Sequence, residues 1–308
     1  MGKVAFIFPG QGAQYIGMAK EFYEKEDISG EIFRRASQIT GIDIPTLCFE
    51  EKEKLDITEY TQIAMVTAEL AIYKVLEKKG YRPDVTAGLS LGEYSAIVAA
   101  GVMRAEDAFA IVRRRGIYMQ EAVPEGGAMA AVLGLECKVI EDVCQAAKGV
   151  VSVANYNCPG QTVITGEADA VFGVGEILKE KGARRVIPLN VSGPFHSAML
   201  VCAGERLSKD LEKIPLSDFS IPYVANLTAD YVRDTEPVKG LLREQISSPV
   251  RWQQSVERMI ADGVDTFVEI GPGKTLSGFI KKIDRQVCVT NIDKYEDLER
   301  VTEVLKNA

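Results

Sequence analysis

Apolar runs alternate with segments of helical periodicity over the first part of the chain. Residues 3–8 and 85–89 are short apolar runs of strand length. Residues 59–79, 93–100 and 106–122 instead place their apolar side chains at helical spacing. Strands that alternate with helices favour a largely parallel sheet with helices on its faces, so the pattern predicts an α/β protein.

The middle of the chain has a different order of elements. The pattern predicts strand 128–133, helix 138–147, strands 150–155 and 162–165, helix 168–181 and strand 184–189. The order β-α-β-β-α-β is typical of a small ferredoxin-like module. Strands at 221–225 and 266–269, with helices at 252–261 and from residues 275 and 295, resume the first pattern.

These patterns predict two structural units. We expect a hydrolase-like parallel-sheet core, discontinuous in sequence, made of residues 1–126 and 192–308. A ferredoxin-like subdomain, residues 127–191, is expected to be inserted into it.

Composition narrows the function classes. The 308 residues carry a formal net charge of −8, which argues against a nucleic-acid partner. The apolar runs are too short to span a bilayer, and the first residues lack a signal-peptide pattern, so a cytoplasmic protein without membrane contact is expected. Six dispersed cysteines and a single histidine make a metal site unexpected.

One pentapeptide suggests chemistry. Gly88-Leu89-Ser90-Leu91-Gly92 lies between a predicted strand and a predicted helix, the context of a nucleophile elbow. A serine hydroxyl needs a base, most often histidine, and His196 is the only one in the chain. It lies in a Gly- and Pro-containing loop, where catalytic residues concentrate. A Gly-rich turn and a structural histidine are the alternative interpretation of these two residues.

Two further features of the sequence bear on this chemistry: the acids between Ser90 and His196, and three successive arginines. No acid between Ser90 and His196 has the strand-end context expected of a third triad member. Arg113, Arg114 and Arg115 are successive positions of a predicted helix, about 100° apart, so they cannot share one face. One of them can point inward, where a guanidinium would bind a carboxylate.

Seven motifs, in order, resemble the malonyl-CoA:acyl-carrier-protein transacylases, and the resemblance covers essentially the whole chain. The motifs are Phe-Pro-Gly-Gln-Gly at 8–12, Gly-Leu-Ser-Leu-Gly-Glu-Tyr-Ser-Ala at 88–96, Arg-Gly-Ile-Tyr-Met-Gln at 115–120, Asn-Tyr-Asn-Cys-Pro-Gly-Gln at 155–161, Gly-Pro-Phe-His-Ser at 193–197, Pro-Val-Arg-Trp at 249–252 and Glu-Ile-Gly-Pro-Gly at 269–273.

The resemblance implies a role for each matching residue. Ser90 would be the acylated nucleophile and His196 its base. Gln11 and Leu91 would supply the backbone N–H groups of an oxyanion hole. The backbone carbonyl of Gln245 would orient His196, which would account for the missing acid.

The same resemblance implies a substrate pocket. Arg115 would bind the free carboxylate of a malonyl group, Met119 would line the pocket, and Asn155 would lie nearby. The Phe195-His196 pair is the form associated with malonyl rather than methylmalonyl transfer. One position departs from the family, since Leu89 stands where a histidine usually precedes the serine.

The implied activity is transfer of malonyl from malonyl-CoA to the phosphopantetheine thiol of acyl carrier protein, for fatty acid synthesis, with no cofactor. Three alternatives stay open: a thioesterase-type serine hydrolase, a trans-acting acyltransferase of a polyketide pathway, and a non-catalytic scaffold. An acidic carrier would need a basic surface to dock on. Candidates for that surface, which could equally be ordinary surface charge, are Lys179, Lys181, Arg184, Arg185, Lys274, Lys281 and Lys282.

Overall fold

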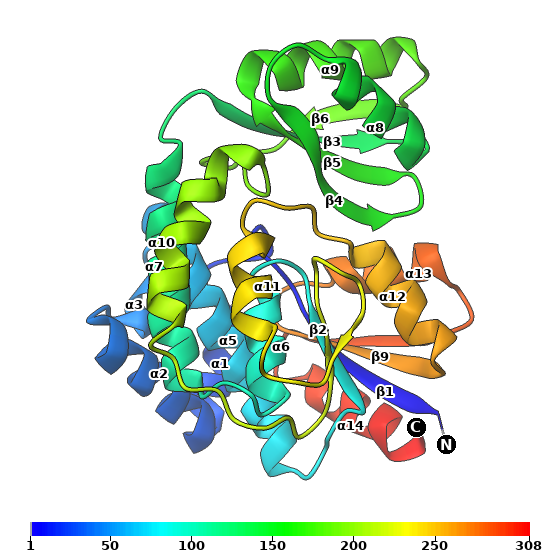
Figure 1. The fold of residues 1–308 in the computed structure, drawn as a ribbon. Helices are drawn as coiled ribbons and strands as arrows, with labels where there is room; N and C mark the ends of the chain where they lie inside the picture. Colours follow the sequence, from blue (N-terminus) through cyan, green and yellow to red (C-terminus); the bar gives the residue numbers. More distant parts are fainter. Residues whose placement is uncertain (1) are drawn as a thin grey trace.

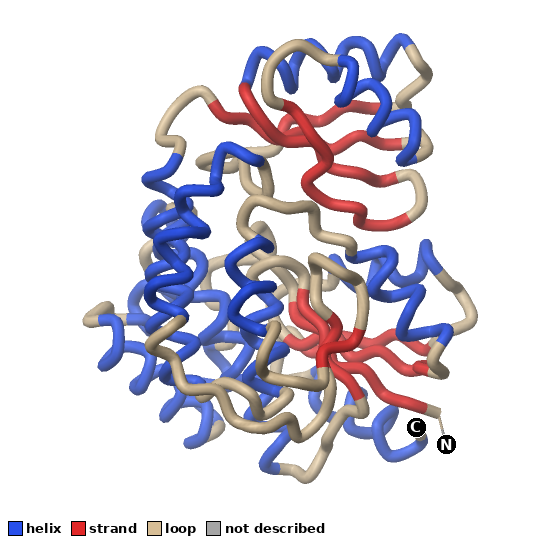
Figure 2. The backbone as a smooth tube through the Cα atoms, in the orientation of Figure 1, coloured by secondary structure: helices blue, strands red, loops and turns tan. Residues whose placement is uncertain are grey.

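The computed structural model describes residues 2–308, whose strands form two separate sheets. Figure 1 shows the smaller sheet, drawn in green with its helices above it, stacked on the larger core. Figure 2 shows loops passing between the two groups of strands. The predicted mixed α/β architecture is confirmed.

The larger sheet is parallel except at one edge. Its spatial order is β10 (Cys288–Ile292), β9 (Val264–Ile270), β1 (Lys3–Phe8), β2 (Val85–Gly88), β7 (Tyr223–Val224) and β8 (Tyr231–Val232). Neighbouring strands are parallel from β10 to β7, and β8 pairs antiparallel with β7. A parallel sheet is covered on both faces, which is why β1 reads as an unbroken apolar run.

Alternate side chains of β1 pack on opposite faces of the sheet. Phe6 and Phe8 lie edge-on to Tyr73 of α5 (Thr58–Lys78), with ring centroids 6.4 and 6.1 Å apart. Ala5 and Ile7 belong to a second apolar cluster that includes side chains of α12 (Trp252–Ala261) and α13 (Thr275–Ile283). The remaining helices of the core are α1 (Lys20–Lys25), α2 (Asp27–Thr40), α3 (Ile44–Phe49), α4 (Lys52–Leu55), α6 (Gly92–Ala99), α7 (Ala105–Ala122), η1 (Ala198–Leu200), α10 (Val201–Leu211), α11 (Val238–Gln245) and α14 (Asp297–Asn307).

The smaller sheet is antiparallel and lies within one continuous stretch of chain. Its spatial order is β4 (Val151–Cys158), β5 (Gln161–Glu167), β3 (Gly127–Leu133) and β6 (Arg185–Pro188). Helices α8 (Cys137–Ala146) and α9 (Ala168–Glu180) share an apolar cluster with this sheet. The chain order and pairing confirm the predicted ferredoxin-like module.

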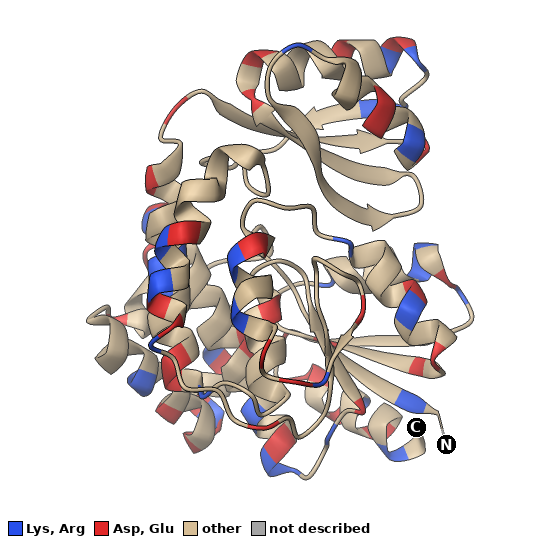
Figure 3. Cartoon of the chain, viewed as in Figure 1, with Lys and Arg blue, Asp and Glu red and all other residues tan. Residues whose placement is uncertain are grey.

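Strand β4 is the edge at which the smaller sheet meets the core. Tyr156 N–H donates to the Val250 carbonyl at 2.9 Å, and Val250 N–H donates to the Ala154 carbonyl at 2.8 Å. Strand β4 carries no charged side chain and is therefore tan along its length in Figure 3, whereas the nearby helices carry charged residues. The core therefore pairs with the edge of the smaller sheet through backbone hydrogen bonds.

Several elements differ from the predicted ones. Strands β4 and β5 are longer than predicted, because register shifts near Asn155 and Tyr156 interrupt the alternation of β4. Strand β7 covers only two residues of the predicted 221–225. The helices between residues 20 and 55 were not predicted from the sequence, nor were α10, α11 and β10.

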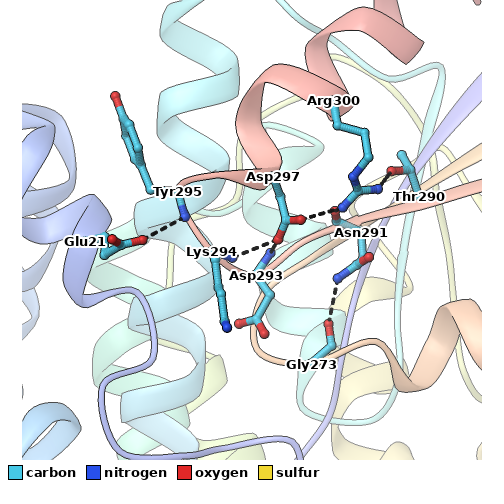
Figure 4. Close-up of polar contacts among 9 residues, drawn as sticks. All are labelled: Glu21, Gly273, Thr290, Asn291, Asp293, Lys294, Tyr295, Asp297 and Arg300. Atoms are coloured by element: carbon cyan, nitrogen blue, oxygen red, sulfur yellow. Dashed lines mark hydrogen bonds and ion pairs between the residues drawn. The ribbon is translucent and has the colours of Figure 1, made fainter.

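Polar contacts stabilise the turn between β10 and α14 and connect the end of β10 to a neighbouring loop (Figure 4). The carboxylate of Asp297 accepts from the backbone N–H of Asp293 at 3.2 Å and of Lys294 at 3.0 Å. Asn291 donates to the carbonyl of Gly273, in the loop after β9, at 3.2 Å. The end of β10 thereby holds the loop that leads into α13.

Candidate active site

Ser90 lies in a strained turn between β2 and α6. Its φ is 53°, a left-handed value that non-glycine residues rarely adopt. Leu89 N–H donates to the Phe8 carbonyl at 3.0 Å, so the turn stays attached to β1. This is the backbone geometry of a nucleophile elbow, in which the serine hydroxyl projects from a sharp strand-to-helix turn.

Glycine is required at positions 88 and 92, because the backbone at each of them packs directly against other backbone atoms. A Cβ on Gly88 would lie 2.0 Å from the carbonyl carbon of Gly92. A Cβ on Gly92 would lie 2.2 Å from the carbonyl oxygen of Phe8. Neither neighbour is a flexible side chain, so any larger residue would force the sheet and α6 apart.

His196 faces the serine from the other side of the cleft. Its Nδ1 lies 2.8 Å from the backbone carbonyl of Gln245, and its Nε2 lies 2.7 Å from Ser90 Oγ. Because a carbonyl can only accept, Nδ1 carries the proton and Nε2 keeps its lone pair. The Ser90 hydroxyl is therefore placed to donate to Nε2, as a nucleophile donates to its base.

Burial keeps this imidazole neutral. His196 is 4% exposed, and burial together with the nearby Arg115 cation lowers its pKa to about 4. The hydrogen bond to the Gln245 carbonyl acts in the opposite direction. Both lowering effects disfavour imidazolium, so His196 has a free lone pair at neutral pH.

The three successive arginines point in different directions, as the helical spacing requires. Arg113 forms an ion pair with Glu59 at 2.6 Å, and Arg114 lies 3.7 Å from Asp210 on the exposed side of α7. Arg115 points inward and is 1% exposed. The prediction that one arginine turns into the protein is confirmed.

The guanidinium of Arg115 lies beside the Ser90 hydroxyl. Its Nη2 donates to Ser90 Oγ and to Gln245 Oε1, both at 3.1 Å, and it lies 5.5 Å from the ring centre of Tyr94. Within residues 2–308, its Nε has no hydrogen-bond partner. Burial lowers the pKa of this guanidinium, yet arginine remains charged in proteins. A buried cation with unused donor capacity is suited to binding an anion.

A polar network supports the elbow from beneath. Asn226 Oδ1 accepts from the backbone N–H of Ser90 and Asn226 Nδ2 donates to the Gly88 carbonyl, both at 2.6 Å. Gln245 Nε2 donates to the Ser90 carbonyl at 2.9 Å and to Glu93 Oε2 at 2.5 Å. The elbow backbone is thus tied to the residue whose carbonyl holds His196.

Glu93 is the titratable end of this network. It is fully buried, and burial raises its pKa to about 7, while hydrogen bonds from Gln245 and Asn226 and the charge of Arg115 oppose that rise. These donors favour the carboxylate form. Neither Glu93 nor Asn226 was predicted from the sequence. The available signals were an acidic residue directly after the Gly-x-Ser-x-Gly motif and a polar residue just after a parallel strand.

One pocket brings all but one of the predicted site residues together. Its lining includes Gln11, Ser90, Leu91, Arg115, Met119, Asn155 and His196, together with Leu89. Gln245 lies behind it, in contact with Arg115 and His196. Among residues 2–308, neither Gln11 nor Leu91 uses its backbone N–H to donate to another residue, so both remain available to a ligand oxygen.

Across residues 2–308, no three His, Cys, Asp or Glu side chains gather as metal ligands. No helix in that range combines the length and the apolarity needed to cross a membrane.

Comparison with known proteins gives one consistent match. The acyl transferase domain family matches residues 5–300. The malonyl CoA-acyl carrier protein transacylase of Bacillus subtilis (strain 168) is 43% identical over 311 residues, which cover 99% of this chain and 98% of that protein.

Solved structures agree with the sequence match. MCAT from Streptococcus pneumoniae superposes with a TM-score of 0.94 at 47% identity, covering 99% of this chain and 100% of that one. A malonyl-transacylase in complex with its type II PKS acyl-carrier protein superposes with a TM-score of 0.95 at 37% identity, with coverage of 99% and 100%.

Proposed function

Because the chain belongs to the acyl transferase domain family, we propose that it transfers malonyl groups from malonyl-CoA to acyl carrier protein, feeding fatty acid synthesis. The observation that carries this proposal is the contact of one serine hydroxyl with both a neutral imidazole and a buried guanidinium. The imidazole suits acyl transfer in general, and the guanidinium suits an acyl group that ends in a carboxylate.

In the first half-reaction, Ser90 Oγ attacks the thioester carbon of malonyl-CoA and passes its proton to His196 Nε2. The backbone N–H groups of Gln11 and Leu91 bind the oxyanion of the tetrahedral intermediate. The carbon–sulfur bond then breaks, the CoA sulfur takes the proton from His196, and a malonyl ester of Ser90 remains.

The second half-reaction reverses these steps with another thiol. The phosphopantetheine thiol of the carrier gives its proton to His196 and attacks the ester carbon of Ser90. The same two N–H groups hold the second oxyanion. When the ester bond breaks, Ser90 Oγ recovers the proton from His196, and malonyl leaves on the carrier.

Arg115 accounts for selection of malonyl. In a malonyl group, a single methylene separates the carboxylate from the reacting carbonyl carbon, so the recognising cation must lie close to Ser90 Oγ. Arg115 Nη2 is 3.1 Å from that oxygen. A charge-assisted hydrogen bond contributes about 1.5–3 kcal/mol, so a bidentate pair would favour malonyl over acetyl by about a hundredfold or more. Met119 and Asn155 would shape the wall of this pocket.

The chemistry proposed here uses only side chains and the two substrates, without a cofactor. We treat residues 127–191 as a subdomain inserted into a core of residues 1–126 and 192–308, since the smaller sheet begins and ends within that stretch. We assign the enzyme to the cytoplasm, where reduced thiols such as the exposed Cys202 and Cys288 persist.

A basic surface beside the pocket suits an acidic carrier. Lys282 Nζ donates to Gln161 Oε1 at 3.2 Å, and Gly134, which packs against Arg184, donates its N–H to the Gly160 carbonyl at 2.8 Å. Lys282 of α13 and Arg184, which directly precedes β6, therefore flank the same turn between β4 and β5. Arg185 and Lys281 are exposed next to them in sequence, whereas Lys179 already pairs with Glu176 at 2.6 Å.

Charge reversal tests this surface. Arg184→Glu with Arg185→Glu should raise the KM for the carrier roughly threefold to tenfold, because steering of an acidic partner is lost. The KM for malonyl-CoA should not change. Equal increases in both constants would exclude the surface as a carrier-specific site.

The proposed activity itself is tested with purified protein, malonyl-CoA and a phosphopantetheinylated carrier of the fatty-acid type. We expect malonyl-carrier to form much faster than free malonate, and Ser90→Ala to abolish it. Rapid release of malonate with little malonyl-carrier would instead identify a hydrolase. Absence of both products would identify a non-catalytic protein.

A further inference from the structure

A threonine outside the elbow and the histidine loop joins two parts of the site. Thr58 is the first residue of α5, and its side chain is fully buried. Its Oγ1 accepts from Gln11 Nε2 at 3.0 Å and lies 2.5 Å from Ser192 Oγ. One hydroxyl thus holds both the loop that follows β1 and the linker that follows β6.

Each partner of Thr58 leads to a proposed catalytic group. Gln11 carries the backbone N–H assigned to the oxyanion hole, and its side-chain amide fixes the orientation of that residue. Ser192 lies four positions before His196, in a linker whose start is held where Leu189 N–H donates to the Met129 carbonyl at 2.9 Å. The end of that linker is held where His196 N–H donates to the Ile246 carbonyl at 3.1 Å.

The backbone at Thr58 has little freedom to move. A Cβ on Gly116 of α7 would lie 3.1 Å from the Thr58 carbonyl oxygen and 2.8 Å from Glu59 Cα. The first turn of α5 therefore packs directly against α7, one residue away from Arg115. Thr58 is therefore a fixed point against which the Gln11 loop and the Ser192 linker are held.

We propose that Thr58 is a positioning residue for acyl transfer, coupling the Gln11 loop to the linker that carries His196. The inference rests on the proposed function, since it assumes that Gln11 supplies an oxyanion donor. Without the hydroxyl, the Gln11 side chain would lose its anchor and its backbone N–H would sample positions away from the oxyanion. Small misplacements of this kind cost up to about a hundredfold in rate.

The test measures the rate of malonyl transfer to Ser90 from malonyl-CoA in the full-length protein. Thr58→Val keeps the shape but removes the hydroxyl, and should lower kcat roughly tenfold to a hundredfold while changing KM less than about threefold. Thr58→Ser should retain kcat within about threefold, because the hydroxyl remains. A matched control is Thr67→Val: Thr67 is equally buried in the same helix but bonds only to the Ile63 carbonyl, at 2.8 Å, so its loss should leave kcat unchanged.

Gln11→Ala tests the same bond from the other side and covers the case in which Thr58→Val does not fold. It removes the side-chain amide and keeps the backbone N–H, so we expect a similar fall in kcat. Combined with Thr58→Val, it should lower kcat no further than Thr58→Val alone, because that change already breaks the bond between Thr58 and Gln11.

Three outcomes would overturn the inference: wild-type kcat in Thr58→Val or in Gln11→Ala, an equal fall in Thr67→Val, or additive effects in the double variant. Failure of the proposed function is distinguishable, because the wild-type protein itself would then release malonate or form no malonyl ester, instead of producing malonyl-carrier.

Discussion

The two residues at the centre of the site reach similar backbone conformations by different means. Ser90 has φ of 53° and His196 has φ of 62°. Around Ser90, the neighbouring glycines Gly88 and Gly92 leave no space for a side chain. Around His196, Gly193 is in ordinary contact with its surroundings, and the loop is held instead by the distant residues 245 and 246.

The geometry of the Ser90 elbow depends on tight packing of its own glycines, whereas that of the His196 loop depends on a distant segment of the chain. The elbow turn is formed by residues adjacent in the chain and packs tightly against the Phe8 carbonyl of β1, so a change there should damage fold and chemistry together. The histidine loop depends on backbone carbonyls of another segment, so a change there should damage chemistry and spare the fold. Four predictions test this difference.

The largest effect is expected at the histidine itself. His196→Ala removes the base and should lower the rate of Ser90 malonylation by about 10⁴-fold or more, as loss of a base does in serine enzymes. The melting temperature should change little, because the loop is held by its backbone. Stopped-flow or quenched assays give the rate and calorimetry gives the stability; a large loss of stability would contradict remote control of this loop.

Arg115→Ala should lower the ratio of malonyl to acetyl transfer by about a hundredfold, since only malonyl carries the carboxylate. Acetyl transfer should be retained or increased. Competition between the two CoA thioesters measures the ratio directly. An unchanged preference would show that another group binds the carboxylate.

A pair of glycine substitutions compares the two regions by stability. Gly92→Ala should destabilise the fold by about 3 kcal/mol, because its Cβ would lie 2.2 Å from the Phe8 carbonyl oxygen. Gly193→Ala should cost less than about 0.5 kcal/mol, since the nearest atom to its Cβ would be 3.4 Å away. Urea unfolding of both variants measures the two losses of stability. Equal losses of unfolding free energy would show that the elbow and the loop do not differ in this respect.

The pH dependence should show how burial acts on the base. With a pKa of about 4, His196 loses its lone pair only in acid, so the acidic limb of kcat/KM for malonyl-CoA should lie well below pH 6.5. Arg115→Ala should move this limb upward only partway, because burial remains. An acidic limb near pH 6.5 in the wild type would contradict the assignment.

The lowered pKa of His196 also determines how the stability of the fold changes with pH. The unfolded chain binds a proton on this histidine below about pH 6.5, whereas the folded chain binds it only below about pH 4. The contribution of His196 to stability is therefore full above pH 6.5 and is lost as the pH falls between these values.

The Ser90 elbow and the His196 loop also differ in how well the sequence alone predicts them. The elbow was predictable because strand, serine, glycines and helix follow one another in a short motif. The contact between His196 and Gln245 could be expected only from family resemblance, since 49 positions separate them and the interaction uses a backbone carbonyl. Thr58 gave no signal, because a threonine that begins a helix looks like many others.

The pattern of apolar residues predicts regular strands and helices better than irregular ones. The parallel strands β1 and β2 were predicted because burial on both faces makes them largely apolar, whereas β10, with the sequence CVTNI, was missed. Strand β4 was cut short in the prediction because its register shifts move side chains out of strict alternation. Helix α5 was predicted within one residue at each end, although it is buried on nearly every side rather than along one stripe.

The central claim is that Ser90 becomes malonylated with His196 as its base. Intact-protein mass spectrometry after incubation with malonyl-CoA alone, followed by peptide mapping, tests it most directly. We predict one malonyl group per chain, located on Ser90 and absent from Ser90→Ala. An unmodified wild-type protein, or a malonyl group that persists on Ser90→Ala, would contradict it.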